Sequence, residues 1–180
     1  MKLVREILYE KFTDESDPIN DMGIGLKHLI EKWLNNFNIL NYTINNDLTI
    51  DLKNDLYLRN CSIKEFPNYI QFNNVAGSVS LADIGLISLR GCPRKIGGFF
   101  SCGYNLITSF TGGPEEILIS STYSRGNSGY GYAASNLKKL VSIEGLAKTI
   151  NGNLWMIDNR NFFTEEEIRK ISNIKGEVIL

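Results

Sequence analysis

The chain has 180 residues, a length that usually folds as one domain and buries a core without help from a metal or a disulfide. Its 19 basic and 20 acidic residues give a net charge of -1, which excludes a bulk attraction to phosphate, so we expect no nucleic acid among its partners. No apolar run reaches membrane-spanning length, so we expect no membrane partner either.

The cysteines and the N-terminus favour an intracellular, cytoplasmic protein. Three cysteines without paired spacing argue against a secreted disulfide framework, and the charged N-terminus lacks the apolar stretch of a signal peptide. Cys61, Cys92 and Cys102 have apolar neighbours, so we expect reduced, buried thiols, with Cys61 and Cys102 at core positions. Titration of the native protein should therefore find little fast-reacting sulfhydryl.

Residues 1–24 are predicted to form a helix and a linker. Apolar residues recur at helical spacing over 2–12, and a stretch rich in helix breakers follows. A clearer amphipathic helix is predicted over 25–37. Because a solenoid needs a cover over the exposed end of its core, we expect this helix to be an N-terminal cap. The single histidine, His28, lies beside the apolar stripe without further donors, so no metal site is predicted.

A repeating unit begins near residue 47. It consists of a glycine, a spacer and two apolar residues separated by one, as in Gly77-Ser78-Val79-Ser80-Leu81. The first two such glycines are 21 residues apart and the last two are 24 apart, and periods in the low twenties are typical of leucine-rich repeats. The alternation predicts short strands with one buried face. We expect these strands near 56–58, 79–81, 100–102, 117–120, 154–156 and 178–180.

The residues that follow the strands keep constant offsets. Asn105, Ile107 and Phe110 follow the strand at 100–102, and equivalent residues follow the two strands before it. This agrees with the leucine-rich pattern, in which Asn or Cys turns the chain out of the strand and satisfies backbone groups. Proline and glycine then forbid a long helix. A helix over 164–171 is the predicted exception, because it opens with a Thr cap and an acidic first turn.

The predicted fold class is therefore α/β. Residues 25–180 are expected to form a short leucine-rich-repeat-like solenoid with one parallel β-sheet, a mostly irregular convex side and the helical cap. Unrelated strands in a β-sandwich are the alternative, which would not keep the offsets. Antiparallel strands, or strands in two facing sheets, would contradict the solenoid.

The run from Ile87 to Cys102 resembles the leucine-rich-repeat-like proteins of large bacteriophages, whose units repeat LTSLEG-CP-xx-VGG-xFxC-xxN. The similarity covers roughly residues 44–160. Asp17-Pro18 with Met22-Gly23-Ile24-Gly25 resembles a leader on proteins of phages that infect Bacteroidota. Members of the family mostly lack an assigned activity, so the resemblance implies a phage-encoded protein that acts by binding in the host cytoplasm. A structural or packaged virion component is the alternative.

Residues 120–136 depart from the repeat as an inserted loop, about a dozen residues longer than the pattern predicts. The segment is rich in Ser, Gly and Asn and contains Tyr123, Arg125, Tyr130 and Tyr132, a mixture typical of antibody paratopes. Insertions in repeat proteins often emerge on the binding face. The alternative is a flexible insertion that is merely tolerated, because loops accept extra length at little cost.

The motifs indicate a binding protein and not an enzyme, with no cofactor. The sequence contains no phosphate-binding loop and no nucleophile elbow. Its acidic residues that are adjacent in sequence are expected to point in different directions, unlike a paired catalytic acid and base. We expect the chain to bind another protein, of the host or the phage, through its concave sheet and the inserted loop.

Strand residues between two core positions face outward. The expected binding residues are Tyr57, Arg59, Ser80, Ser101, Tyr104, Trp155 and Asp158, together with Tyr123, Arg125, Tyr130 and Tyr132 of the loop. An outward Trp155 would expose apolar area, unless the insertion covers it as ordinary packing. The identity of the partner and the oligomeric state stay open.

Overall fold

The computed structural model describes residues 18–119 and 130–180, so the helix predicted over 2–12 and most of the predicted insertion lie outside the described residues. Two sheets form the body of the molecule. Sheet A contains, in spatial order, β1 (Tyr42–Ile44), β2 (Ile50–Leu52), β4 (Phe72–Val75), β6 (Lys95–Ile96), β8 (Glu116–Ile117), β10 (Thr149–Ile150) and β12 (Asn173–Ile174). Sheet B contains β3 (Leu56–Tyr57), β5 (Val79–Ser80), β7 (Phe100–Ser101), β9 (Tyr130–Ala133), β11 (Asn153–Trp155) and β13 (Val178–Ile179).

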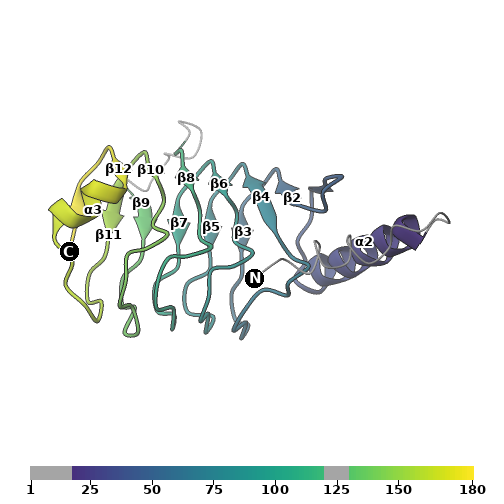
Figure 1. Cartoon of the computed structure of the whole chain (residues 1–180), viewed down its shortest axis with the longest axis horizontal. Coiled ribbons are helices and arrows are strands. Elements are labelled where there is room, and N and C mark those ends of the chain that lie inside the picture. The colour runs from purple at the N-terminus through teal and green to yellow at the C-terminus, as the bar shows by residue number, and fades with distance from the viewer. Residues whose placement is uncertain (1–17, 120–129) are drawn as a thin grey trace.

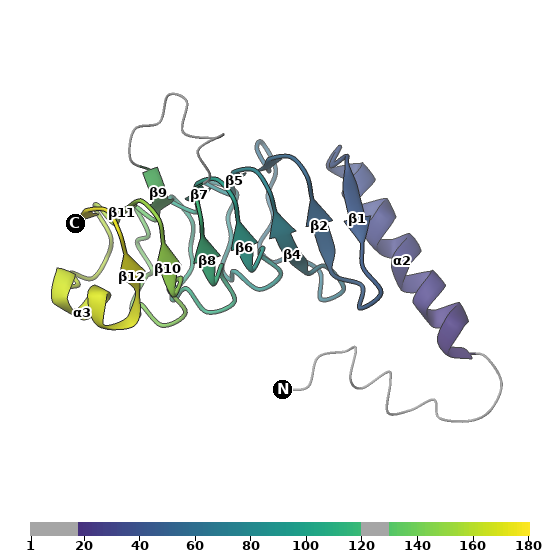
Figure 2. The same cartoon turned by 90° about the horizontal axis from the view of Figure 1, so that it is seen from above.

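The chain winds as a β-solenoid, whose coils stack along the long axis of the molecule (Figure 1). We call a coil one strand of sheet A, the following strand of sheet B and the turns that lead to the next coil. All strand pairs between coils are parallel, and only β1 and β2 pair antiparallel at the N-terminal end of sheet A. Figure 2 shows sheet A as one row of strands from β1 to β12. The solenoid with parallel strands is thus confirmed.

The prediction of a single sheet is wrong, and so is the expectation that strands in two facing sheets would contradict a solenoid, because each coil contributes one strand to each of the two sheets. The strand expected at 117–120 begins at Glu116 as β8 and belongs to sheet A, whereas the other five predicted strands lie in sheet B. Within a coil, a tight corner joins the two strands. The two strands enclose the core between them, which a single strand could cover on one side only. Several of these corners contain glycine, as at Gly97, where an added Cβ would clash with the backbone oxygen of Ala76 in the preceding coil. Strands of the two sheets alternate along the chain, so equivalent residues of successive coils still recur at the spacing that the sequence repeat predicts.

The inserted loop is also shorter than predicted. Val79 pairs with Phe100, 21 residues further on, whereas Phe100 pairs with Tyr132, 32 residues further on. Residues 130–133 are therefore β9, a strand between β7 and β11 whose pairing with β11 shifts register by one residue after Tyr130, and the extra length precedes it. The assignment of 120–136 as one loop is wrong at its C-terminal end, because the glycine that marks the other strands is displaced here.

The core lies between the sheets and consists of residues stacked in register. The inward row of sheet A, all 5% exposed or less, is Leu52, Val75, Ile96, Ile117, Ile150 and Ile174. The inward row of sheet B begins with Leu56, Val79, Phe100, Tyr132 and Leu154, which are 1% exposed or less. Burial of each such side chain stabilises the fold by about 2 kcal/mol. Stacking of coils supplies this burial, since no coil could hide its inward residues alone.

Asn105 confirms the expected role of the polar residue after the strand. Its buried side-chain oxygen accepts hydrogen bonds from the backbone N–H groups of Ile84, Gly85 and Leu86 at 3.2, 3.0 and 3.0 Å. Its side-chain nitrogen donates to the carbonyls of Leu81 and Cys102 at 2.7 and 2.9 Å. One amide thus satisfies five backbone groups where two neighbouring coils leave sheet B.

Two helices are described, one toward each end of the solenoid (Figure 1). Helix α2 (Pro18–Asn36) starts earlier than the predicted 25, and its Trp33 ring lies 5.7 Å from Phe66 and 6.3 Å from Phe72. Helix α3 (Glu165–Ile171) has Thr164 as N-cap and an acidic first turn, as predicted, and Glu167 completes a capping box with Thr164. Within the described residues, no helix is both long and apolar enough to cross a membrane.

Candidate binding face on sheet B

The outward side chains of sheet B form one row in register. Because side chains alternate along a strand, each coil presents one residue between its two inward positions. The row runs Tyr57, Ser80, Ser101, Ala133, Trp155 and Ile179. It carries no charged side chain. Tyr57, Ser80, Ser101 and Trp155 were predicted to share this face, and the structure brings them together.

Tyr57 is the most exposed aromatic residue in this row. Its side chain is 41% exposed, and the guanidinium carbon of Arg59 lies 5.0 Å from the centre of its ring. Partial burial raises the pKa of Tyr57, and hydrogen bonding and charge from Asp55 raise it further. The phenol is therefore neutral at physiological pH, so it presents a ring face and a hydrogen-bonding group without a charge.

Trp155 is less exposed than predicted. It is half-buried between the half-buried Ala133 and Ile179 of the neighbouring strands, and so part of its ring is packed. The sequence left bare exposure and ordinary packing as alternatives, and the observed burial lies between them. Trp155 is therefore a partly exposed aromatic residue and not an isolated aromatic surface.

Tyr132 is not a surface residue, contrary to prediction. It is fully buried, with its ring centre 4.9 Å from that of Phe100 and 5.6 Å from that of Phe110. The register of β9 turns Tyr132 inward, in line with Phe100 and Leu154. Burial raises the pKa of its phenol well above the ordinary value.

The remaining predicted residues lie beside this row or outside the described chain. Tyr104 and Asp158 occupy the turns that follow β7 and β11, and both are exposed. Arg59 follows β3 and is exposed as well. Tyr123 and Arg125 lie outside the described residues, as does the side chain of Tyr130.

Ala133 and Ile179 belong to the row but were missed. The alternation in Gly176-Glu177-Val178-Ile179-Leu180 already indicated an outward Ile179. Ala133 had no such signal, because its strand was taken for part of the loop.

The turn after each of the strands β3, β5, β7, β9 and β11 contains one non-glycine residue in the left-handed conformation. These residues, with φ from 54° to 58°, are Asn60, Asp83, Tyr104, Asn136 and Asp158. Asn and Asp tolerate this conformation better than other residues with a Cβ, whereas a bulky residue there is strained. Tyr104 is thus the exception in the series, and its side chain is 63% exposed.

The three thiols differ in burial. Cys92 and Cys102 are buried, and burial raises the pKa of Cys102 to about 12. Cys61 is only half-buried, so the core position predicted for it is reached in part. Among the described residues, no three His, Cys, Asp or Glu side chains gather so that they could hold a metal ion.

Comparison of the chain with family models, with curated proteins and with solved structures gave no significant match.

Proposed function

We propose that this protein is a non-catalytic module that binds another protein through the outward face of sheet B, with Tyr104 at its border. The observation that carries the proposal is the contrast between the two sheets. The outward row of sheet A, in register, is Asp51, Asn74, Lys95, Glu116, Thr149 and Asn173. Every member of that row is polar, whereas the row of sheet B contains two aromatic rings and no charge.

Charged side chains on and beside the strands of sheet A form ion pairs at solvent-exposed positions. Lys95 pairs with Glu116 at 3.1 Å, and Lys148 pairs with Glu115 at 3.6 Å, all at partly or largely exposed positions. Such pairs mark a solvated surface and contribute little to stability. Protein interfaces are instead depleted of charge at their centre and enriched in Tyr and Trp, as the row of sheet B is.

Tyr104 supports the same face. A tyrosine held at φ 58° and 63% exposed is unfavourable for folding, since Asn or Asp would fit the turn better. Strain of this kind is concentrated at functional sites. An exposed aromatic side chain that the fold itself does not require is a natural anchor for a partner.

We further propose that the solenoid is leucine-rich-repeat-like, that α2 is its N-terminal cap, and that the protein is encoded by a phage and acts in the cytoplasm. The constant offsets, with Asn105 in the turning position, support a leucine-rich-repeat-like solenoid. The contacts of Trp33 with Phe66 and Phe72 support α2 as an N-terminal cap. A phage origin rests on the sequence resemblance alone, and a cytoplasmic site of action rests on that resemblance together with the unpaired cysteines and the charged N-terminus. Mass spectrometry of purified phage particles distinguishes a host-directed protein from a virion component, since only the latter is abundant in particles.

Site-specific photo-crosslinking tests the binding face. A benzophenone side chain replaces Tyr57 or Tyr104 on sheet B, and matched variants carry it at Glu116 or Thr149 on sheet A. Irradiation in cells that make the protein should yield the same discrete adduct from both sheet B positions and none from sheet A. Adducts of equal yield from both sheets, or none from sheet B, would overturn the proposal.

The Tyr104→Asn variant separates binding from folding. Because Asn suits the left-handed turn, we expect a gain in stability of about 1 kcal/mol. The adduct formed from position 57 should nevertheless weaken at least several-fold in this background. The reverse exchange, Asp83→Tyr, is the control, which should destabilise the protein by a similar amount. An adduct that keeps its yield in Tyr104→Asn would remove Tyr104 from the interface.

A further inference from the structure

The carbonyl groups at one register position of sheet A each accept a hydrogen bond from the next coil. These carbonyls belong to Leu52, Val75, Ile96, Ile117 and Ile150. The donors are the N–H groups of Ala76, Gly97, Leu118, Asn151 and Lys175, at 2.8 to 2.9 Å. Ile174 is the partner of Ile150 and so occupies the same position in the last described coil. Its carbonyl is where the N–H of a further coil would bind.

A second acceptor repeats at the corner between the sheets. The carbonyl of Gly77 accepts from the N–H of Gly98 at 2.9 Å, and that of Gly152 accepts from Gly176 at 3.2 Å. The carbonyl of Gly176 would serve the next coil in the same way. A further coil would thus need both Ile174 and Gly176 as acceptors.

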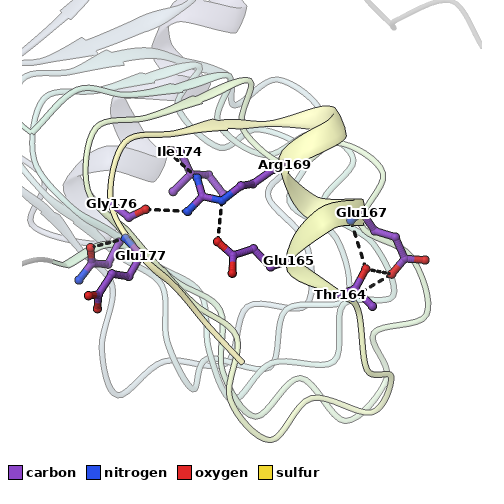
Figure 3. A network of polar contacts seen from close by, with 8 residues as sticks. Thr164, Glu165, Glu167, Arg169, Ile174, Gly176 and Glu177 are labelled. Atoms are coloured by element: carbon purple, nitrogen blue, oxygen red, sulfur yellow. Dashed lines mark hydrogen bonds and ion pairs between the residues drawn. The ribbon is translucent and has the colours of Figure 1, made fainter.

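Arg169 of α3 already occupies both acceptors (Figure 3). Its Nη1 donates to the Ile174 carbonyl at 2.7 Å, and its Nη2 donates to the Gly176 carbonyl at 2.9 Å. Its Nε donates to the Glu165 carboxylate at 2.7 Å, which orients the guanidinium. A planar guanidinium offers several donors in a fixed fork, and it can therefore replace two backbone donors at once.

We propose that Arg169 terminates the solenoid: its guanidinium takes the place of the N–H donors of a further coil and closes this end of sheet A against a second copy of the chain. An open sheet edge is a template for pairing with another chain, and natural proteins cover or charge such edges. Here the cover is a charged side chain supplied by α3. This inference is independent of the binding face on sheet B.

Arg169→Met tests the proposal because it keeps an unbranched side chain but removes every donor. Ile168 is fully buried and keeps α3 docked, so the substitution should free the two carbonyls and leave the helix in place. Sedimentation velocity should show larger species that increase over a roughly hundredfold rise in protein concentration. Lys170→Met is the matched control: Lys170 lies on the same helix and pairs only with Glu166, at 2.9 Å, so its loss should leave the sedimentation unchanged.

Arg169→Lys provides a second variant in case the methionine protein does not fold. Lysine keeps the charge but lacks the planar fork, so we expect association weaker than that of a folded Arg169→Met and stronger than that of Lys170→Met. Circular dichroism establishes that each variant is folded. Two results would overturn the proposal: folded Arg169 variants that sediment like the Lys170 control at every concentration, or variants that lose thermal stability without associating.

Discussion

Single polar side chains connect neighbouring coils, and Asn105 is the strongest case. A buried amide that satisfies five backbone groups cannot be replaced by an apolar side chain without leaving donors and acceptors unpaired. Asn159 repeats part of the arrangement two coils later, where it donates to the carbonyls of Ala134 and Met156. The polar residue of the repeat is thus a structural element.

Asn105→Ala should destabilise the protein by on the order of 4 kcal/mol, because several buried backbone groups lose their only partner. Urea denaturation measures the loss. Asn161→Ala is the matched control, since this exposed amide donates only one long hydrogen bond, 3.4 Å, to Val141. We expect the control to change stability by less than about 0.5 kcal/mol. Equal effects of the two substitutions would show that the Asn105 contacts contribute little.

The three cysteines should differ in reactivity. The thiolate is the reactive form, and burial raises the pKa of Cys61 moderately, that of Cys102 to about 12 and that of Cys92 well above normal. A thiol reagent at mildly alkaline pH should modify Cys61 first, and Cys92 and Cys102 only as the protein unfolds. Cys61→Ser should abolish the early phase. Rapid modification of all three thiols in the native protein would contradict the observed burial.

Among the elements, α3 has the most complete local signals in the chain. Thr164 and Glu167 form a reciprocal capping box, and three acidic residues begin the helix while Arg169 and Lys170 end it. These features are local in sequence, and so the helix could be predicted within a residue of its observed bounds. In α2 the start was misplaced, because Pro18 is a good first residue for a helix although the glycines that follow indicate a linker.

The capping box makes α3 sensitive to acid. Hydrogen bonds from Thr164 lower the pKa of Glu167 below its ordinary value of 4.5. A lowered carboxyl pKa in the folded state stabilises that state above the ordinary pKa, and the contribution is lost as pH falls through the folded pKa. Glu167→Gln should therefore reduce the acid-induced loss of stability below pH 4.5, measured by thermal unfolding across pH. Glu166→Gln, outside the capping box, should retain it; identical pH profiles would refute the role of Glu167.

At the scale of the whole molecule, the two faces of the solenoid have different surfaces. The row of sheet A is polar and contains the Lys95–Glu116 ion pair, and the row of sheet B is uncharged with aromatic residues near its ends. The ends differ too: Trp33 packs on the first coils, whereas Arg169 occupies the acceptors of the last. The contrast between the faces arises only when residues 20 or more positions apart are stacked in register.

The sequence by itself determined five of the six strands of sheet B, the turning role of Asn105 and helix α3. Alternation, turn residues and helix caps are local, and they specify the backbone without knowledge of neighbours. Most of the outward row followed from the same alternation. Tyr57, Ser80, Ser101 and Trp155 were identified because each lies between two inward residues of its own strand.

Only the tertiary structure decided the second sheet, the burial of Tyr132 and the contacts of Arg169. The glycine that precedes the predicted strands does not mark the strands of sheet A, which form because successive coils supply their hydrogen-bond partners. Tyr132 lies in the core because pairing with Phe100 sets its register across an interval of irregular length. Arg169 has an ordinary place on a helix, and its role follows from two carbonyls that the stacking of coils leaves at the end of sheet A.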